Sequence, residues 1–176
     1  MPEFHVTGLL VPLHQPKDQV CWATVATILL SWHDNITYTI EEVMDKAGPK
    51  YRQLYENNTA LSLEDTPELL QKLKLVAEPP EMNHSPNGWM KLLKDYGPLW
   101  VALAPNPADP VSGHAIVLTG MSIDDNDNIE RTHFNYIDPL DRSGSEQIIS
   151  INEFVKMFEA IAKVKPIVLQ VCHFPH

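Results

Sequence analysis

Residues 20–32 are the segment that most constrains how this chain can fold. Four large apolar residues recur at helical spacing, namely Val25, Ile28, Leu29 and Trp32. The positions between them are mostly Ala, Thr, Trp and Val, so the predicted helix is apolar on nearly all sides and must be buried. The chain is 176 residues long and 44% hydrophobic, which suffices for such a core. We therefore expect residues 1–176 to form a single domain.

The remaining elements separate into helices in the first half and strands in the second. Capping signals predict three helices in the first half. One begins at Thr39 and ends before Gly48, and the others begin at Thr66-Pro67 and at Ser85-Pro86. A late helix is expected at 152–163. Strands are predicted where β-branched and aromatic residues gather between turns, at 99–103, 114–121, 129–138, 146–151 and 166–174, with a hairpin loop at 122–128. This order indicates an α+β protein with a mainly helical lobe, 1–97, and a mainly β lobe, 98–176.

Cys21 stands at the front of the buried helix. A thiol is a useful nucleophile only as the thiolate, and a helix N-terminus favours that negative charge. Gln15 lies six positions earlier, and an amide donor there is suited to stabilise the oxyanion formed when a thiolate attacks a carbonyl. The alternative is a structural cysteine, because free cysteines are often buried and Cys21 shares a helical stripe with Val25 and Ile28.

A nucleophilic cysteine needs a base, usually a histidine oriented by a third group. Among the eight histidines, His114 follows a glycine-containing loop and opens an apolar strand, which predicts a ring at the rim of a cleft. Asp138 ends a later predicted strand, and Pro139 after it stops the strand and fixes the turn. Asp141 and Asn135 are the alternative orienting residues.

Four motifs in this order resemble the papain-like cysteine peptidases over about residues 10–140. They are Gln15-Pro16-x4-Cys21-Trp22-Ala23, Gly97-Pro98-Leu99-Trp100-Val101, Gly113-His114-Ala115-Ile116-Val117-Leu118 and Asp138-Pro139. The pattern is most similar to the compact bacterial branch that includes the AvrRpt2-type effector proteases and the C39-like peptidases. This resemblance implies a two-lobe fold whose helical lobe carries the Cys helix and whose antiparallel β lobe carries His and Asp.

The same resemblance implies a role for each matching residue. Cys21 would be the nucleophile, His114 the general base and acid, and Asp138 the orienting residue, in place of the Asn of papain itself. Gln15 and the Cys21 backbone N–H would form the oxyanion hole, and Trp22 would contact the substrate. No metal or organic cofactor is implied.

The expected function is a cysteine endopeptidase that cleaves protein or peptide substrates through a thioester acyl-enzyme. Three alternatives remain open. The same residues suit other acyl chemistry, such as transglutamination, deamidation or amide cleavage. The chain is also compatible with a secreted bacterial effector or toxin that a dedicated immunity protein inhibits. A catalytically silent binding module is the third alternative, although an inactive chain has no chemical need to retain Gln15, Cys21, His114 and Asp138 together.

Charge and composition exclude several other classes. The net charge is −10 and no Lys/Arg run exists, which disfavours nucleic acid and anionic membrane surfaces as partners. No signal peptide or membrane span is predicted, so we expect a chain made in the cytoplasm, whose export would use a leaderless route. Cys21 and Cys172 make no disulfide framework. The segment Asp124–Asn128 resembles the start of a calcium-binding loop but lacks the glycine and glutamate that such a loop requires. The cysteines and histidines do not show the spacing of a structural zinc site.

Overall fold

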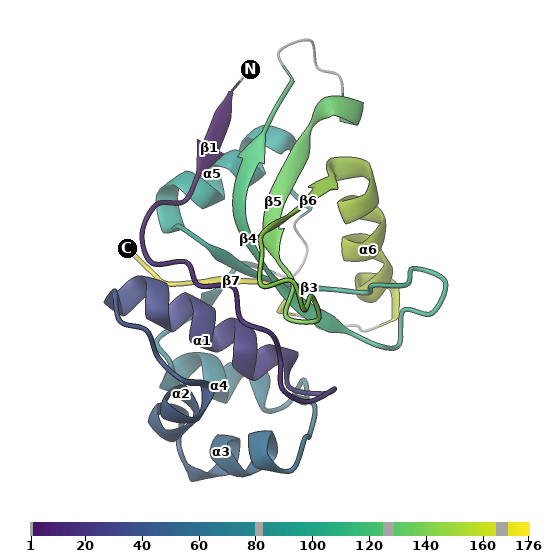
Figure 1. The fold of residues 1–176 in the computed structure, drawn as a ribbon. Coiled ribbons are helices and arrows are strands. Elements are labelled where there is room, and N and C mark those ends of the chain that lie inside the picture. The colour runs from purple at the N-terminus through teal and green to yellow at the C-terminus, as the bar shows by residue number, and fades with distance from the viewer. Residues whose placement is uncertain (1, 80–82, 125–128, 165–168) are drawn as a thin grey trace.

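Helix α1, Cys21–Asp34, lies at the centre of the computed structural model, between a group of helices and a β-sheet (Figure 1). The structure describes residues 2–79, 83–124, 129–164 and 169–176. The calcium-like motif, the tip of the predicted hairpin loop and the start of the last predicted strand therefore lie partly outside the described residues. The other helices are α2 Ile40–Ala47, α3 Pro49–Glu56, α4 Thr66–Lys72, α5 Pro86–Tyr96 and α6 Ile151–Val164, with a 3₁₀ turn η1 at Ile129–Arg131.

The predicted burial of α1 is confirmed. All residues from Trp22 to Ser31 are buried, including Thr24 and Thr27. These two hydroxyls donate to the carbonyls of Val20 and Ala23 one turn earlier, at 3.0 and 2.8 Å, so the helix interior leaves neither of them unpaired. Helix α1 packs against α2 on one side and against strands β3 and β4 on the other.

Helices α2–α4 gather on the side of α1 that faces away from the sheet (Figure 1). The predicted capping box at the start of α2 is confirmed: Glu42 N–H donates to Thr39 Oγ1, and Thr39 N–H donates to the Glu42 carboxylate. Helix α3 was not predicted. It begins at Pro49 directly after Gly48, because a proline is well suited to the first turn of a helix.

The strands form one antiparallel sheet with the order β2-β7-β3-β4-β5-β6, and β1 pairs with β4 beyond the end of β3. Over the described residues the strands are β1 Glu3–His5, β2 Val76–Ala77, β3 Leu99–Leu103, β4 His114–Ser122, β5 His133–Ile137, β6 Gln147–Ser150 and β7 Val171–His173. The mixed fold with an antiparallel sheet confirms the predicted α+β class. Strand β3 has the predicted bounds, whereas β1 and β2 were not predicted.

Both faces of the sheet are covered. In β3, Trp100 packs with helices α1–α4, whereas Leu99 and Val101 pack with α5 and α6 on the opposite face. In β4, Val117 packs with helices α1–α4 and Ile116 packs with α5 and α6. Helix α5, which the sequence placed in the helical lobe, therefore packs on the sheet, and β1 and β2 from the first half of the chain belong to the sheet as well. Strands β3 and β4 are buried at nearly every successive position and therefore require cover on both faces, part of which α5 supplies.

Gly97, directly after α5, is the point where this part of the chain meets α1. Its φ is +81°, in the region that favours glycine, and an added Cβ would lie 2.2 Å from Cη2 of Trp32. The Trp32 indole also donates to the carbonyl of Thr7 at 2.8 Å. The last turn of α1 is thereby fixed against both the N-terminal segment and the start of β3.

Candidate active site

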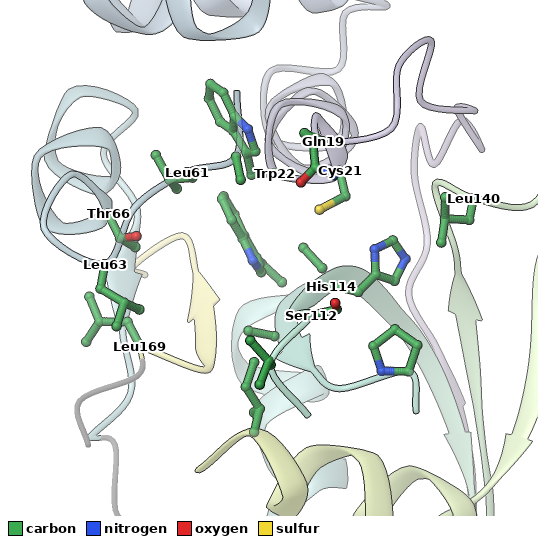
Figure 2. A pocket seen from close by; sticks show the side chains of 18 of the residues that line it. Gln19, Cys21, Trp22, Leu61, Leu63, Thr66, Ser112, His114, Leu140 and Leu169 are labelled. Atoms are coloured by element: carbon green, nitrogen blue, oxygen red, sulfur yellow. The ribbon is translucent and has the colours of Figure 1, made fainter. Parts of the chain in front are cut away.

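A cavity of about 470 Å³ opens at the N-terminal end of α1. Its walls come from the first turn of α1, the segment before α4, strands β3 and β4 and the loops beside them. Figure 2 shows Cys21 and His114 on one side of the cavity, with Leu61 and Leu63 on the other side. Segments far apart in the sequence therefore meet at this point.

Cys21 is the first residue of α1, and its side chain is half-buried on the cavity wall. The preceding residue, Val20, supplies no side-chain cap. The first N–H groups of a helix have no acceptor within the helix, so they offer positive partial charge to an anion at this end. The local structure thus suits a thiolate and, beside it, the oxyanion of a substrate.

His114 is the first residue of β4, and its side chain is only 7% exposed. Its Nε2 lies 2.6 Å from Oδ1 of Asp138, which directly follows β5. Strands β4 and β5 are paired so that Ile137 lies opposite Val117, which brings the start of one strand to the end of the other. Since Asp138 occupies Nε2, Nδ1 is the ring nitrogen that remains for Cys21, which lines the same cavity.

The surroundings of His114 favour its charged form. Burial alone lowers the pKa of His114, but the hydrogen bond and charge of Asp138, together with those of Cys21, outweigh burial and raise the pKa to about 9. For Asp138, burial raises the pKa, whereas the hydrogen bond to His114 and its charge lower it, and the net pKa lies below the usual value. The arrangement therefore favours an imidazolium next to a carboxylate near neutral pH.

The turn that carries Asp138 is held by several backbone groups. Leu140 N–H donates to Oδ1 of Asp138 at 2.9 Å, and Asp141 N–H donates to the carbonyl of Asp138 at 3.0 Å. The next carbonyl, that of Pro139, accepts from the side chain of His14 at 2.9 Å. These bonds fix the carboxylate relative to the backbone rather than leaving it on a free rotamer.

Gln15 is placed differently from the expectation. It is 3% exposed, and its Nε2 donates to the carbonyls of Lys17 and Asp18 at 2.8 and 2.9 Å. Both amide hydrogens are therefore in use, while Oε1 is buried without a hydrogen-bond partner in the structure. Gln15 folds the loop before Cys21 onto itself in this conformation, and its role as an oxyanion donor stays a prediction.

Trp22 lines the cavity but is only 3% exposed, and its contact with substrate stays a prediction. Its indole N–H donates to the carbonyl of Thr59 at 3.1 Å. The sequence did not indicate the other apolar residues of the cavity wall. They include Leu61, Leu63, Trp100, Val111 and Leu140. Of these five, all except Trp100 come from loops, where no periodic pattern marks a residue as part of a site.

The alternative orienting residues do not contact His114 in any hydrogen bond found among the described residues. The Asn135 amide donates to Glu146, and Asp141 accepts from Ser143 and Gln147. Another pair, the buried His173 Nε2 and the half-buried Glu78 at 2.8 Å, involves the residue that follows Cys172. Burial raises the pKa of the Cys172 thiol to about 12, so this second cysteine is unreactive near neutral pH.

Two further features of the described residues bear on partners. No helix in these ranges is long and apolar enough to cross a membrane. Within the same part of the chain, no group of three or more His, Cys, Asp or Glu side chains is close enough together to hold a metal ion.

A comparison with protein families adds independent evidence. The model of the family described as papain-like cysteine protease AvrRpt2 matches residues 6–159. That stretch includes the cavity residues of α1, β3 and β4 and the turn after β5. A search of curated proteins finds no match. The chain belongs to the AvrRpt2 family of papain-like cysteine proteases, which are hydrolases that act on protein or peptide substrates.

Proposed function

We propose that this protease is an endopeptidase in which Cys21 is the nucleophile, His114 the general base and acid, and Asp138 the residue that orients His114. The observation that carries the proposal is the position of the His114 ring. Its Nε2 lies 2.6 Å from Asp138, and the ring lines the same cavity as Cys21, close enough for Cys21 to help raise the pKa of His114. A thiol, an imidazole and a carboxylate in this order form the arrangement that activates a sulfur nucleophile.

In the acylation step, the Cys21 thiolate attacks the carbonyl carbon of the scissile peptide bond. The carbon–sulfur bond forms while the carbonyl oxygen takes up negative charge. When the tetrahedral intermediate collapses, His114 donates its proton to the departing nitrogen, the carbon–nitrogen bond breaks, and a thioester remains on Cys21. The raised pKa of His114, about 9, keeps that proton on the ring until the leaving group needs it.

In the deacylation step, the now neutral His114 takes a proton from a water molecule that attacks the thioester. The carbon–sulfur bond then breaks, the carboxylic acid product leaves, and the thiolate–imidazolium pair is restored. Asp138 stays ionised throughout, because its pKa is lowered by His114 and by the N–H of Leu140. Its part is to hold the ring orientation and to stabilise the imidazolium.

The oxyanion of both intermediates requires hydrogen-bond donors. The backbone N–H of Cys21, at the uncapped end of α1, is the first donor that we propose. Gln15 Nε2 is the second. To reach the oxyanion, it has to give up its bond to either Lys17 or Asp18, so we propose that the side chain turns when substrate enters.

Labelling with a thiol-directed epoxide tests the nucleophile. Wild type and the Cys21→Ala and His114→Ala variants are compared by intact mass after a short exposure. We expect wild type to gain one label, Cys21→Ala to gain none, and His114→Ala to react at least about 100-fold more slowly, because base assistance contributes about that much. Cys172→Ala is the matched control, and it should label as fast as wild type because Cys172 is 1% exposed.

A random peptide library, read by mass spectrometry, then tests the reaction. Internal cleavage that is lost in Cys21→Ala supports the endopeptidase. Conversion of glutamine to glutamate without chain cleavage would assign the same residues to deamidation instead. If Cys21 reacts no faster with the epoxide than a free thiol in solution, the proposed mechanism is wrong. A role as an exported effector is proposed from the family alone, and an inhibitory immunity partner stays a prediction.

A further inference from the structure

The carbonyl oxygen of Pro139 accepts two hydrogen bonds from the segment that leads to Cys21. His14 donates from Nδ1 at 2.9 Å, and the backbone N–H of Gln15 donates at 2.8 Å. Since a carbonyl can only accept, the His14 ring carries a hydrogen on Nδ1. The side-chain bond joins positions 125 residues apart in the sequence, one on the nucleophile side of the cavity and one on the turn after β5.

Pro139 follows the residue that orients His114. The proline ring fixes its φ and therefore the position of its carbonyl carbon relative to Asp138, and the hydrogen bond from Asp141 N–H to the Asp138 carbonyl closes the turn around it. The carboxylate of Asp138 in turn lies 2.6 Å from Nε2 of His114. A displacement of the Pro139 carbonyl is therefore passed on to the ring that faces Cys21.

We propose that His14 is a positioning residue for catalysis. Its hydrogen bond to Pro139 holds the Asp138 turn at the distance at which Asp138 orients His114 toward Cys21. This inference rests on the proposed catalytic roles of those three residues. His14 is not among the residues that line the cavity, so it acts through Asp138 and not through contact with substrate.

Because the Pro139 carbonyl accepts a second hydrogen bond, the effect of His14 on the position of the turn can be measured separately from an effect on the stability of the fold. When the His14 side chain is removed, Pro139 still accepts from the N–H of Gln15. No buried acceptor is left without a partner, so the large penalty for an unpaired group does not arise. What is lost is one of the two hydrogen bonds that the Pro139 carbonyl accepts. A misplacement well below 1 Å is enough to slow the chemical step, since reacting groups have to be held at close distances.

Three substitutions at position 14 test this inference, with kcat and KM measured on the library peptide that wild type cleaves fastest. His14→Asn keeps a donor at the place of Nδ1, His14→Gln moves the donor outward, and His14→Ala removes it. We expect His14→Ala and His14→Gln to lower kcat about tenfold or more, with KM within about twofold of wild type. His14→Asn should retain most of the wild-type kcat.

His133→Ala is the matched control, because the His133 ring also contacts a backbone carbonyl, that of Arg131 at 3.2 Å, but lies away from the cavity. It should leave kcat unchanged. Equal kcat in wild type and His14→Ala would overturn the inference, as would equal losses in His14→Ala and His14→Asn. If Cys21→Ala cleaves as well as wild type, the proposed function itself has failed. A result that affects only the His14 series leaves that function intact.

Discussion

Replacing Asp138 with asparagine is expected to lower the pKa of His114 and thereby shorten the pH range in which the imidazolium persists. The substitution removes one charge and keeps the shape of the side chain. Burial alone lowers the pKa of His114, yet the pKa is about 9, and the hydrogen bond to Asp138 is the largest of the causes that raise it. Relative to the ordinary value of 6.5, the net elevation corresponds to about 3 kcal/mol, which is what Asp138 and Cys21 together supply beyond the opposing effect of burial. We expect Asp138→Asn to lower the pKa of His114 by at least about one, which corresponds to roughly 1 kcal/mol.

Two alkylating reagents of different charge read the protonation of His114 without any knowledge of the substrate. Iodoacetate is anionic and is attracted by the imidazolium beside the Cys21 thiolate, whereas iodoacetamide is neutral. The ratio of their second-order rate constants at Cys21 should therefore fall as His114 loses its proton. In wild type the midpoint of that fall is expected near pH 9, and in Asp138→Asn at least about one unit lower. Cys172 adds no background, since its thiol is buried and has a pKa of about 12.

Asp141→Asn is the matched control, because it removes the same charge three residues further along the same turn. Asp141 is bonded to Ser143 and Gln147 and not to His114. Its midpoint should stay within about 0.3 units of wild type, since a rim charge in water acts weakly. If the midpoint of Asp138→Asn also stays within that range, the electrostatic argument for the site is refuted.

The same pair of groups makes the stability of the fold depend on pH. A histidine whose folded pKa is raised contributes stability that is fully present below its unfolded value of 6.5 and is lost as the pH rises through about 9. The lowered pKa of Asp138 adds stability above its usual value that is lost as the pH falls through the folded pKa. Urea unfolding should therefore find Asp138→Asn least stable relative to wild type near pH 6, by at most about 3 kcal/mol, with the deficit shrinking toward pH 10.

Two further substitutions test the loop before Cys21 and the end of α1. Gln15→Ala should lower kcat about 100- to 1000-fold if its amide reaches the oxyanion, while iodoacetamide still labels Cys21; a loss below about threefold would show that Gln15 only braces the loop. Gly97→Ala should lower the free energy of unfolding by more than about 2 kcal/mol, because both its φ of +81° and the 2.2 Å approach to Trp32 oppose a Cβ. Gly144→Ala is its control in urea unfolding. Gly144 also has a positive φ, +64°, but an added Cβ would have no neighbouring atom within 4 Å, so only about 1 kcal/mol of backbone strain is expected. Equal losses in the two variants would contradict the steric argument.

The elements with strong local signals were predictable from the sequence. The buried helix, the capping box at Thr39 and the N-cap at Ser85 all occur where the side chains indicated them. In each case the information lies within a few residues: an apolar run, a hydroxyl followed by a glutamate, or a serine before a proline. The family resemblance likewise rests on short motifs, and the family match to residues 6–159 confirms it.

Elements that depend on distant partners were not predictable in this way. Strands β1 and β2 are three and two residues long, and they exist because β4 and β7 offer them an edge. The predicted strand at 129–138 begins only at His133, because η1 precedes it. The same limit applies within the site. The bonds of Gln15 to the Lys17 and Asp18 carbonyls depend on how one loop folds, which no spacing in the sequence encodes.

The sheet that packs against α1 on one face and against α5 and α6 on the other has a consequence for how the cavity can move. Cys21 is on a helix that packs directly against β4, the strand that begins with His114, so the two residues lie on elements that are in contact and not on parts joined by a hinge. Widening the gap between them would require the apolar contact between α1 and the sheet to open. We therefore expect selectivity among substrates to arise from the loops at the rim, where Leu63 and Val111 are 44% and 71% exposed, while the distance between sulfur and imidazole stays the same from one substrate to the next.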